Sequence, residues 1–258
     1  MKTSISNQNP FSMNAKGYLW EYLSRSGGVG NHLDYGAHDA DMISKFKNTG
    51  VIKRGVGVDL NSTVVAQVQG SLPDGISLLA IKKNPQLPFE SDHFDSTSIV
   101  GVLEHILDQD HILQELKRVT KVGGTILVAV PGQNIFSFLD MGNWKFVFPR
   151  LHRFFYTLSH SEDAYIARYT ANKDGLIGDI EAEKAWHEHF TKPQLEAKLR
   201  ANGLEIVETD GAGFFFRIFV NMGFFLPERL RNVVMPLINV DAKFFSSAEI
   251  WTLARKSR

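Results

Sequence analysis

Several residues of this chain combine the side-chain types and the spacing that a ligand-binding site needs. The stretch HLDYGAHDAD, residues 32–41, places Asp34, Tyr35 and Gly36 in succession. A carboxylate accepts hydrogen bonds, and a glycine lets the backbone approach a ligand without a Cβ in the way. A plain turn would explain the single glycine equally well. The stretch lacks the full G-x-G-x-x-G pattern, so it favours a ligand without phosphate over a dinucleotide.

A second carboxylate, Asp59, ends the apolar stretch VIKRGVGVDL, residues 51–60. In nucleotide-binding sheets an acid at the end of the second strand accepts hydrogen bonds from both hydroxyls of a ribose. The structural alternative is an aspartate that shapes the turn or caps the helix beginning at NSTVV. The residues alone favour neither function.

Three histidines could remove the proton of a weak nucleophile such as a hydroxyl group. His105 closes the stretch DSTSIVGVLEH, and His187 and His189 belong to WHEHF, residues 186–190. His105 at the end of a strand is the first candidate for a general base. The structural alternative is a histidine that bonds the backbone where a helix begins.

An alternation of strands and helices has to position these residues. We expect strands at 31–36, 51–60, 76–81, 95–105 and 125–130, with helices at 39–48, 62–69 and 108–120 between them. This order predicts an α/β fold with a doubly wound, parallel sheet and helices on both faces. In such a sheet the ligand lies beyond the carboxyl ends of the strands. We therefore expect the site to be lined by Gly36, Asp59, Asn84, Gly101–His105 and Pro131.

Composition limits the classes of function. The 258 residues include 28 Lys and Arg and 28 Asp and Glu, so the net charge of zero argues against general nucleic-acid binding. The absence of cysteine excludes disulfides and thiolate catalysis. The first residues, MKTSISNQNP, lack the apolar core of a signal peptide, and no apolar run reaches the ~18 residues of a membrane span. We expect a cytoplasmic protein.

The second half of the chain follows a looser pattern. Residues 132–190 are rich in aromatic and basic side chains, and we expect them to cover the cleft. The basic side chains of this region either meet an anionic group or form a solvated surface; they are Lys145, Arg150, His152, Arg153 and Arg168. A helix at 191–202 and strands at 204–210 and 248–256 follow. The apolar segment 213–227 is core, a dimer face, or an interfacial helix that reaches a lipid-linked acceptor.

Residues 84–131 resemble the class I S-adenosylmethionine-dependent methyltransferases, in the branch of quinone-biosynthesis and small-molecule O-methyltransferases. The resemblance is carried by LPF followed by FD, by LEHI at a strand end, by ELKRV, by a GG turn and by a buried strand ending at Pro131. It extends from about residue 30 and continues weakly through HFTKPQLEAKLRANGLEIVE. It implies a Rossmann-like methyltransferase sheet, mostly parallel, with an antiparallel C-terminal strand. The whole chain, 1–258, would be one domain, with a cofactor-binding core (28–131), an acceptor lid (132–190) and a closing segment (191–258).

The resemblance also assigns roles to residues. Asp34 and Gly36 match the family's first motif, hydrophobic-Asp-x-Gly-x-Gly-x-Gly, whereas His38 and Ala40 stand where further glycines are usual. The remaining cofactor contacts would be Asp59 on the ribose, Leu60 on the adenine face, Asn84 on the adenine amino group, and Gly101, Val102 and Leu103 along the methionine arm. Some relatives hold a divalent ion with Glu-x-x-Glu-His. Gly101 replaces the first of these acids, so we expect no metal, although Glu104, His105, His187 and His189 have the types of ligands.

The function implied is S-adenosylmethionine-dependent methylation, with oxygen of a small or lipid-linked acceptor as the target. A saccharide intermediate of surface-polysaccharide synthesis is the expected acceptor, because residues 160–215 look like methyltransferases of that setting. Two alternatives stay open: a non-catalytic protein that keeps the fold as a scaffold, and a nicotinamide-dependent oxidoreductase. We expect no nucleic-acid partner, and leave open a homodimer and a peripheral contact with a membrane.

Overall fold

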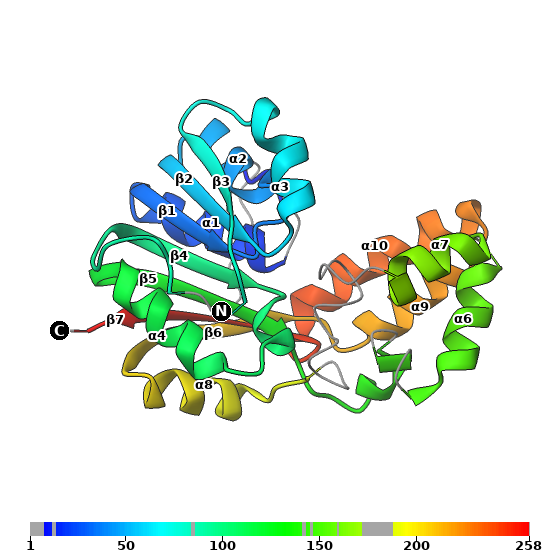
Figure 1. The fold of residues 1–258 in the computed structure, drawn as a ribbon. Helices are drawn as coiled ribbons and strands as arrows, with labels where there is room; N and C mark the ends of the chain where they lie inside the picture. The colour runs from blue at the N-terminus through cyan, green and yellow to red at the C-terminus, as the bar shows by residue number, and fades with distance from the viewer. Residues whose placement is uncertain are drawn as a thin grey trace.

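A seven-stranded β-sheet organises the residues that the computed structural model describes, which are 8–11, 14–83, 86–140, 143–144, 147–158, 160–171 and 188–257 (Figure 1). Its strand order is β3-β2-β1-β4-β5-β7-β6. The strands are β1 (Val29–Tyr35), β2 (Ile52–Asp59), β3 (Ile76–Ala80), β4 (Phe94–Val100), β5 (Thr120–Pro131), β6 (Leu204–Ala212) and β7 (Glu249–Lys256). Only β7 runs against its neighbours within this described sheet. The predicted mostly parallel sheet with an antiparallel C-terminal strand is therefore confirmed.

The winding of the sheet reverses between β1 and β4. β1 pairs with β2 on one side and with β4 on the other, so the chain builds outward to β3 before it returns. Loops that leave two such strands diverge at the carboxyl edge and leave space between them for a ligand. A ligand site is therefore expected between the segments that follow Tyr35 and Val100.

Helices cover both faces of the sheet, as Figure 1 shows. The flanking helices are α1 (Ala15–Arg25), α2 (Asp41–Asn48), α3 (Ser62–Val68), α4 (Gln109–Val119) and α8 (Lys192–Ala201), with short helical turns η1 (Gln69–Ser71) and η2 (Leu103–His105). The predicted helix at 191–202 is confirmed by α8, which Thr191 begins with a capping box to Gln194. Such a cap satisfies N–H groups that the helix leaves without partners.

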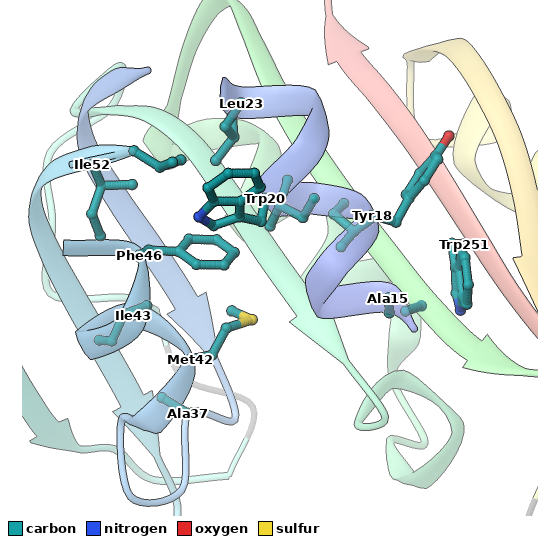
Figure 2. Close-up of a cluster of buried hydrophobic side chains, with 14 of the residues drawn as sticks. Ala15, Tyr18, Trp20, Leu23, Ala37, Met42, Ile43, Phe46, Ile52 and Trp251 are labelled. Carbon is teal, nitrogen blue, oxygen red and sulfur yellow. The ribbon is translucent and has the colours of Figure 1, made fainter. Parts of the chain in front are cut away.

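Two apolar clusters hold these helices on the sheet. In one, Trp20 of α1 lies against Phe46 of α2 (Figure 2), and Leu23 and Ile43 belong to the same cluster. The other cluster joins Leu116 and its neighbours on α4 to α8 and the opposite face of the strands. The central strand serves both, since Leu127 and Ala129 belong to the first cluster and Ile126, Val128 and Val130 to the second. This alternation has the two-residue period of a strand that is buried on both faces.

A separate group of helices lies beyond the carboxyl ends of β4 and β5 (Figure 1). It contains α6 (Pro149–Thr157), α7 (Glu162–Ile166), the π-helical turn η4 (Ala167–Ala171), α9 (Phe216–Phe225) and α10 (Glu228–Phe244), with the turn η3 (Ser137–Leu139) beneath. We call these elements the helical lobe. No helix in the described part of the chain is long and apolar enough to cross a bilayer.

The structure differs from the sequence-based expectation in a few elements. The fourth strand ends at Val100 and continues as the turn η2, because Gly101 adopts a φ of 67° that extended backbone does not allow. The buried strand β5 starts at Thr120, before the two glycines rather than after them. The 17-residue helix α10 was not predicted, and Pro236 within it obscures its helical pattern.

Candidate functional site

The first wall of the site is the loop between β1 and α2. Gly36, directly after β1, has a φ of 81°, and a Cβ at this position would come within 2.3 Å of Val102 Cγ2. A side chain is therefore excluded twice, by the left-handed backbone and by the contact with Val102. This approach joins the loop after β1 to the loop after β4, at the place where the winding reverses.

His38 and Ala40 keep the backbone shape of the glycines that they replace. Their φ angles are 50° and 60°, which is the left-handed region. The side chain of His38 is half-exposed, whereas Ala40 is buried. The loop thus has a left-handed backbone at two residues that carry a Cβ. This conformation costs about 1 kcal/mol or more of folding free energy at each of them.

Asp34 is a buried carboxyl group at the base of this loop. It is the register partner of Ser98 across β1 and β4, and Ser98 Oγ donates to its Oδ1 at 2.7 Å. Burial raises the pKa of Asp34 to about 7, while the Ser98 hydroxyl and the Lys16 charge act in the opposite direction. A proton at this position therefore exchanges near neutral pH.

Asp59 closes β2 and lies beside the same loop. Its Oδ2 accepts from His38 N at 2.8 Å, and its Oδ1 accepts from Asn61 N at 2.9 Å. These two bonds fix the orientation of a carboxylate that is only 7% exposed. Each carboxylate oxygen has about two acceptor positions, so a second bond can form at each. The arrangement is suited to a pair of hydroxyl donors.

A cavity of about 460 Å³ lies against this loop. Its lining residues are Lys16, Asp34, Gly36, Ala37, His38, Asp39, Asp41, Met42 and Val100. We call it the loop cavity. It brings together Asp34 and Gly36 as the sequence predicts, whereas Asp59 and Leu60 lie at the neighbouring strand end and do not line it.

The other predicted cofactor residues are placed as follows. Tyr35 and Leu103 are buried in the apolar cluster beneath α4, so their side chains point away from the loop cavity. Val102 packs on Gly36, and Gly101 lines a second cavity. Asn84 lies outside the described residues.

The second cavity, of about 300 Å³, opens between the sheet and the helical lobe. Its lining includes Val100, which also lines the loop cavity. Its lining residues are Ala15, Val100, Gly101, Glu104, Ala129, Val130, Pro131, Leu139, Asp140, Phe216, Arg217, Val220, Asn221, Ala248, Glu249 and Trp251. We call it the lobe cavity. Asn221 closes one wall by donating to the carbonyl of Leu139 at 2.8 Å.

Charged side chains meet in the lobe cavity. Burial raises the pKa of Glu249, and the nearby charge of Glu104 acts in the same direction. Burial lowers the pKa of Arg217, against the charges of Asp140 and Glu249. Arg217 is 7% exposed and donates to the carbonyl of Gly132 at 2.9 Å. The guanidinium is thus an internal countercharge within a group of carboxyls.

The sequence did not indicate Asp140, Arg217, Glu249 or Trp251 as site residues. The residues predicted from the sequence lie at the ends of parallel strands, which meet at the same edge of the sheet. Glu249 instead begins the antiparallel β7 and is the register partner of Pro131, the last residue of β5. Glu249 directly precedes the apolar run IWTLA of the strand that was expected to be antiparallel, and this position is the signal that indicates it in the sequence.

The candidate histidines differ in their surroundings. His189 Nε2 donates to Asp140 Oδ2 at 2.5 Å, so it lies directly behind the wall of the lobe cavity. His105 Nε2 lies 4.0 Å from Glu104 Oε1, and neither cavity includes His105 in its lining. His187 lies outside the described residues. Of the three, His189 has the clearest connection to a cavity.

Of the basic residues predicted in the lid, Arg150, His152 and Arg153 have described side chains, and these three do not line either cavity. Arg153 pairs with Glu162 and lies over the ring of Tyr165. His152 is buried against the same tyrosine, and Arg150 is exposed. Lys145 and the side chain of Arg168 lie outside the described part. Among the described residues, no group of three or more His, Asp or Glu could hold a metal ion.

The apolar segment predicted at 213–227 contributes part of the wall of the lobe cavity. It forms α9, and four residues of this helix, Phe216, Arg217, Val220 and Asn221, line the lobe cavity. The adjacent α10 exposes apolar side chains at alternating spacings of three and four residues, namely Leu230, Val233, Leu237, Val240 and Phe244. Exposed apolar side chains at this spacing form a stripe along one side of a helix.

Part of the chain is similar to a known family of domains. Residues 33–128 match the family model described as a methyltransferase domain. A curated relative is the ubiquinone/menaquinone biosynthesis C-methyltransferase UbiE of Vibrio vulnificus, 28% identical over 158 residues, which are 59% of this chain and 60% of the relative. The chain thus aligns with less than two thirds of that relative.

Solved structures agree on the fold. A putative methyltransferase of Haloferax volcanii, solved with the Trm112 activator, matches with a TM-score of 0.57 at 16% identity, over 92% of this chain and 88% of the other. The 1,6-didemethyltoxoflavin-N1-methyltransferase of Burkholderia thailandensis, solved with S-adenosylhomocysteine, matches with a TM-score of 0.55 at 14% identity, over 95% and 79%. The predicted fold is confirmed.

Proposed function

We propose that this chain, a member of the class I methyltransferase family with its matching domain at residues 33–128, uses S-adenosylmethionine to methylate an oxygen of a small or lipid-linked acceptor. The main supporting observation is Asp59, a fixed and buried carboxylate beside the Gly36 loop. Both of its oxygens can take a second hydrogen bond, as the two ribose hydroxyls require. The cytoplasm is the proposed location.

The residues of the two loops would hold the cofactor. Asp59 would accept hydrogen bonds from the two ribose hydroxyls, and Leu60 would pack on the adenine. Asn84 would accept a hydrogen bond from the adenine amino group. The other proposed contacts, along the methionine arm, are Asp34, Tyr35, Gly36, Gly101, Val102 and Leu103, with Tyr35 and Leu103 contributing their backbone. When bound, S-adenosylmethionine supplies a methyl group on a sulfonium. The protein would mainly align the acceptor with that group.

A base would prepare the acceptor hydroxyl. His189 is the first choice, because its Nε2–H donates to Asp140 Oδ2 at 2.5 Å, and this hydrogen bond orients the ring beside the lobe cavity. An imidazole oriented by a carboxylate is a common general base. His105, next to Glu104, and His187 are the other proposed bases. Val100 lies between the two cavities, which favours transfer from the loop cavity toward the lobe cavity.

The proposal also covers the chemical class of the acceptor. A saccharide intermediate of surface-polysaccharide synthesis is the first candidate, on the resemblance of residues 160–215. The second candidate is a quinone precursor methylated on carbon, because the curated relative is named a quinone-biosynthesis C-methyltransferase. Turnover of labelled S-adenosylmethionine with saccharides, quinols and phenols separates the two.

The helical lobe supports two proposed partners. The exposed stripe of α10 fits either a second copy of the chain or the surface of a membrane that carries a lipid-linked acceptor. Sedimentation of the protein alone detects the first, and flotation with phospholipid vesicles detects the second.

Ligand-dependent thermal stability tests the cofactor. S-adenosylhomocysteine should raise the melting temperature, whereas NAD(H) should not, because only a ligand that binds the folded state stabilises it. Asp59→Asn should lower the affinity for S-adenosylhomocysteine, and Asp74→Asn, an exposed aspartate before β3, should leave it unchanged. Stabilisation by NAD(H) alone would support the oxidoreductase alternative, and stabilisation by neither would support the scaffold.

A further inference from the structure

We propose that the exposed apolar stripe of α10 binds the surface of an anionic membrane, with its apolar side chains among the lipid chains and a basic edge at the level of the phosphate groups. This inference deepens the proposed function and rests on it only in that the membrane would carry the lipid-linked acceptor. The binding surface itself follows from the residues of α10. The stripe consists of Leu230, Val233, Leu237, Val240 and Phe244.

The stripe is an exception among the helices of this protein. Among the described residues, none of the large, exposed apolar side chains lies on the helices that cover the sheet, which are α1, α2, α3, α4 and α8. On α10, by contrast, Val233 is 68% exposed and Phe244 is 74% exposed. Exposed apolar side chains that gather on one surface mark a place where a protein or a membrane binds.

The two edges of the stripe differ in charge and in exposure. Because successive residues of a helix are turned by about 100°, Arg229 and Lys243 lie along one edge of the stripe, and Val234 and Asp241 lie along the other. Both cations are exposed, whereas Asp241 is buried and Val234 is partly buried. The outward edge of the stripe is therefore basic, and its inward edge is turned toward the protein.

This order of side chains is suited to the boundary between lipid and water. Beyond the basic edge, farther around α10, the exposed residues are Asn232 and Asn239. The surface thus changes from apolar to basic to polar around the helix. A helix that lies in a membrane surface has the same order, since its Lys and Arg side chains extend to the phosphate groups while its apolar face is buried.

A second copy of the chain suits the stripe less well, because the charges oppose it. Helices paired along such a stripe are stabilised by opposite charges beside it. An antiparallel, symmetric pair centred on Pro236 would bring Arg229 of one copy level with Lys243 of the other, so that two cations would meet. A parallel pair would bring these cations to the opposite edge, where Asp241 is buried and accepts from Phe214 N at 2.9 Å. Lipid phosphates supply the negative charge that neither pairing provides.

The stripe lies one helix away from the lobe cavity. Phe216 and Val220 of α9 line that cavity, and α10 packs on α9 (Figure 1). The two helices approach closely, since a Cβ at Gly223 of α9 would lie 2.6 Å from Met235 Sδ of α10. Packed helices have axes roughly 10 Å apart, so a membrane bound to α10 would hold the lobe cavity close to the lipid surface.

Binding of the full chain to phospholipid vesicles tests the inference. In flotation without cofactor, the protein should bind vesicles of equal parts phosphatidylcholine and phosphatidylglycerol roughly tenfold or more tighter than vesicles of phosphatidylcholine alone. High salt should weaken the binding to the mixed vesicles, because it screens the charges. Absence of binding to the mixed vesicles, or equal binding to both kinds, would overturn the inference.

A pair of basic-edge substitutions tests the charges. Arg229→Gln combined with Lys243→Gln should weaken binding to the mixed vesicles by roughly tenfold or more, because each basic residue near an anionic surface contributes to binding. Lys53→Gln combined with Arg54→Gln, two exposed cations on β2, should leave the binding unchanged. An equal loss in both double variants would show that any exposed cation acts in this way and would overturn the assignment to α10.

A pair of stripe substitutions tests the apolar contact. Val233→Ser combined with Phe244→Ser should weaken vesicle binding by roughly tenfold or more, because less apolar area would enter the lipid. Both side chains are largely exposed, so the melting curve should match that of the wild type. Val122→Ser, which changes an exposed valine on β5, should bind vesicles like the wild type. Unchanged vesicle binding in the stripe variant would overturn the inference.

Two further outcomes separate the alternatives. Sedimentation that shows a dimer of the wild type and a monomer of the stripe variant would assign the stripe to a second copy and overturn the inference. A protein that binds vesicles but not S-adenosylhomocysteine would support the membrane surface and contradict the proposed function. A protein that binds S-adenosylhomocysteine but not vesicles would overturn the membrane surface alone.

Discussion

His32 and Asp34 contact the same hydroxyl group. Ser98 Oγ lies 3.0 Å from His32 Nε2 and donates to Asp34 Oδ1 at 2.7 Å. Because the single hydroxyl proton goes to Asp34, the oxygen accepts from His32 Nε2–H, and His32 Nδ1 accepts from Ser96 at 2.7 Å. A buried chain of hydrogen bonds thus runs across β1 and β4 to the base of the loop cavity.

The first prediction concerns the pH dependence of stability. Burial lowers the pKa of His32 to about 3. Below pH 6.5 the unfolded chain therefore binds a proton at this histidine that the folded chain does not bind, so the stability of the fold decreases as the pH falls. Burial raises the pKa of Asp34 to about 7, so between pH 7 and about 4 the folded chain binds the extra proton, and stability rises. From pH 6.5 to about 4 the two effects oppose each other.

Removing the histidine should expose the effect of Asp34. His32→Asn should gain stability relative to the wild type as the pH falls from 6.5 to 4, by at most about 1.4 kcal/mol per pH unit. Urea denaturation at several pH values measures this. His93→Asn, which changes an exposed histidine, should follow the wild type. Parallel curves for His32→Asn and the wild type would contradict the pKa of His32.

The second prediction concerns cofactor affinity and rests on the proposed function. Asp34 lines the loop cavity, and its carboxyl is mostly protonated below pH 7. The charged carboxylate attracts the ammonium group of S-adenosylhomocysteine, so affinity should rise with pH between 6 and 8, by at most about tenfold per unit. Calorimetry should find this rise absent in Asp34→Asn. The rise in affinity with pH should persist in Asp39→Asn. A rise of equal size in Asp34→Asn would show that a group other than Asp34 causes it.

The sequence predicted the residues that depend on strand order. Asp34, Gly36 and Asp59 lie at the carboxyl ends of parallel strands. Because parallel strands end at one edge, their proximity could be expected before the structure. Glu249 and Arg217 could not be found in this way. Glu249 reaches the site because β7 runs in the opposite direction. Arg217 reaches it because α9, a helix of the helical lobe, lines the lobe cavity. The placement of Arg217 depends on a tertiary contact that local patterns do not encode.

The positions of the candidate bases also depend on tertiary structure that the sequence pattern does not indicate. His105 was the first choice because it follows a strand, but the backbone turns at Gly101 and the structure brings Glu104 to the lobe cavity in its place. His189 is connected to the cavity through Asp140, which lies far from it in the chain. Which imidazole acts as the base stays a prediction for kinetic study.

The third prediction concerns the left-handed residues of the β1–α2 loop. A residue with a Cβ costs about 1–2 kcal/mol in this conformation, whereas glycine loses about 0.5–1 kcal/mol more entropy on folding. His38→Gly should therefore be neutral or stabilising by up to about 1 kcal/mol, because its side chain is half-exposed. Ala40→Gly should be close to neutral, because it also removes a buried methyl group worth about 0.8 kcal/mol.

Ala37 supplies the matched control for these glycines. It is buried in the same loop but its φ is not positive, so Ala37→Gly loses the methyl group and chain entropy without relief of strain. Urea denaturation should show Ala37→Gly destabilised by about 1–2 kcal/mol while His38→Gly is not. If His38→Gly lost as much stability as Ala37→Gly, the imidazole would make contacts that outweigh its backbone strain. The departure from the family's glycines would then serve the stability of the loop.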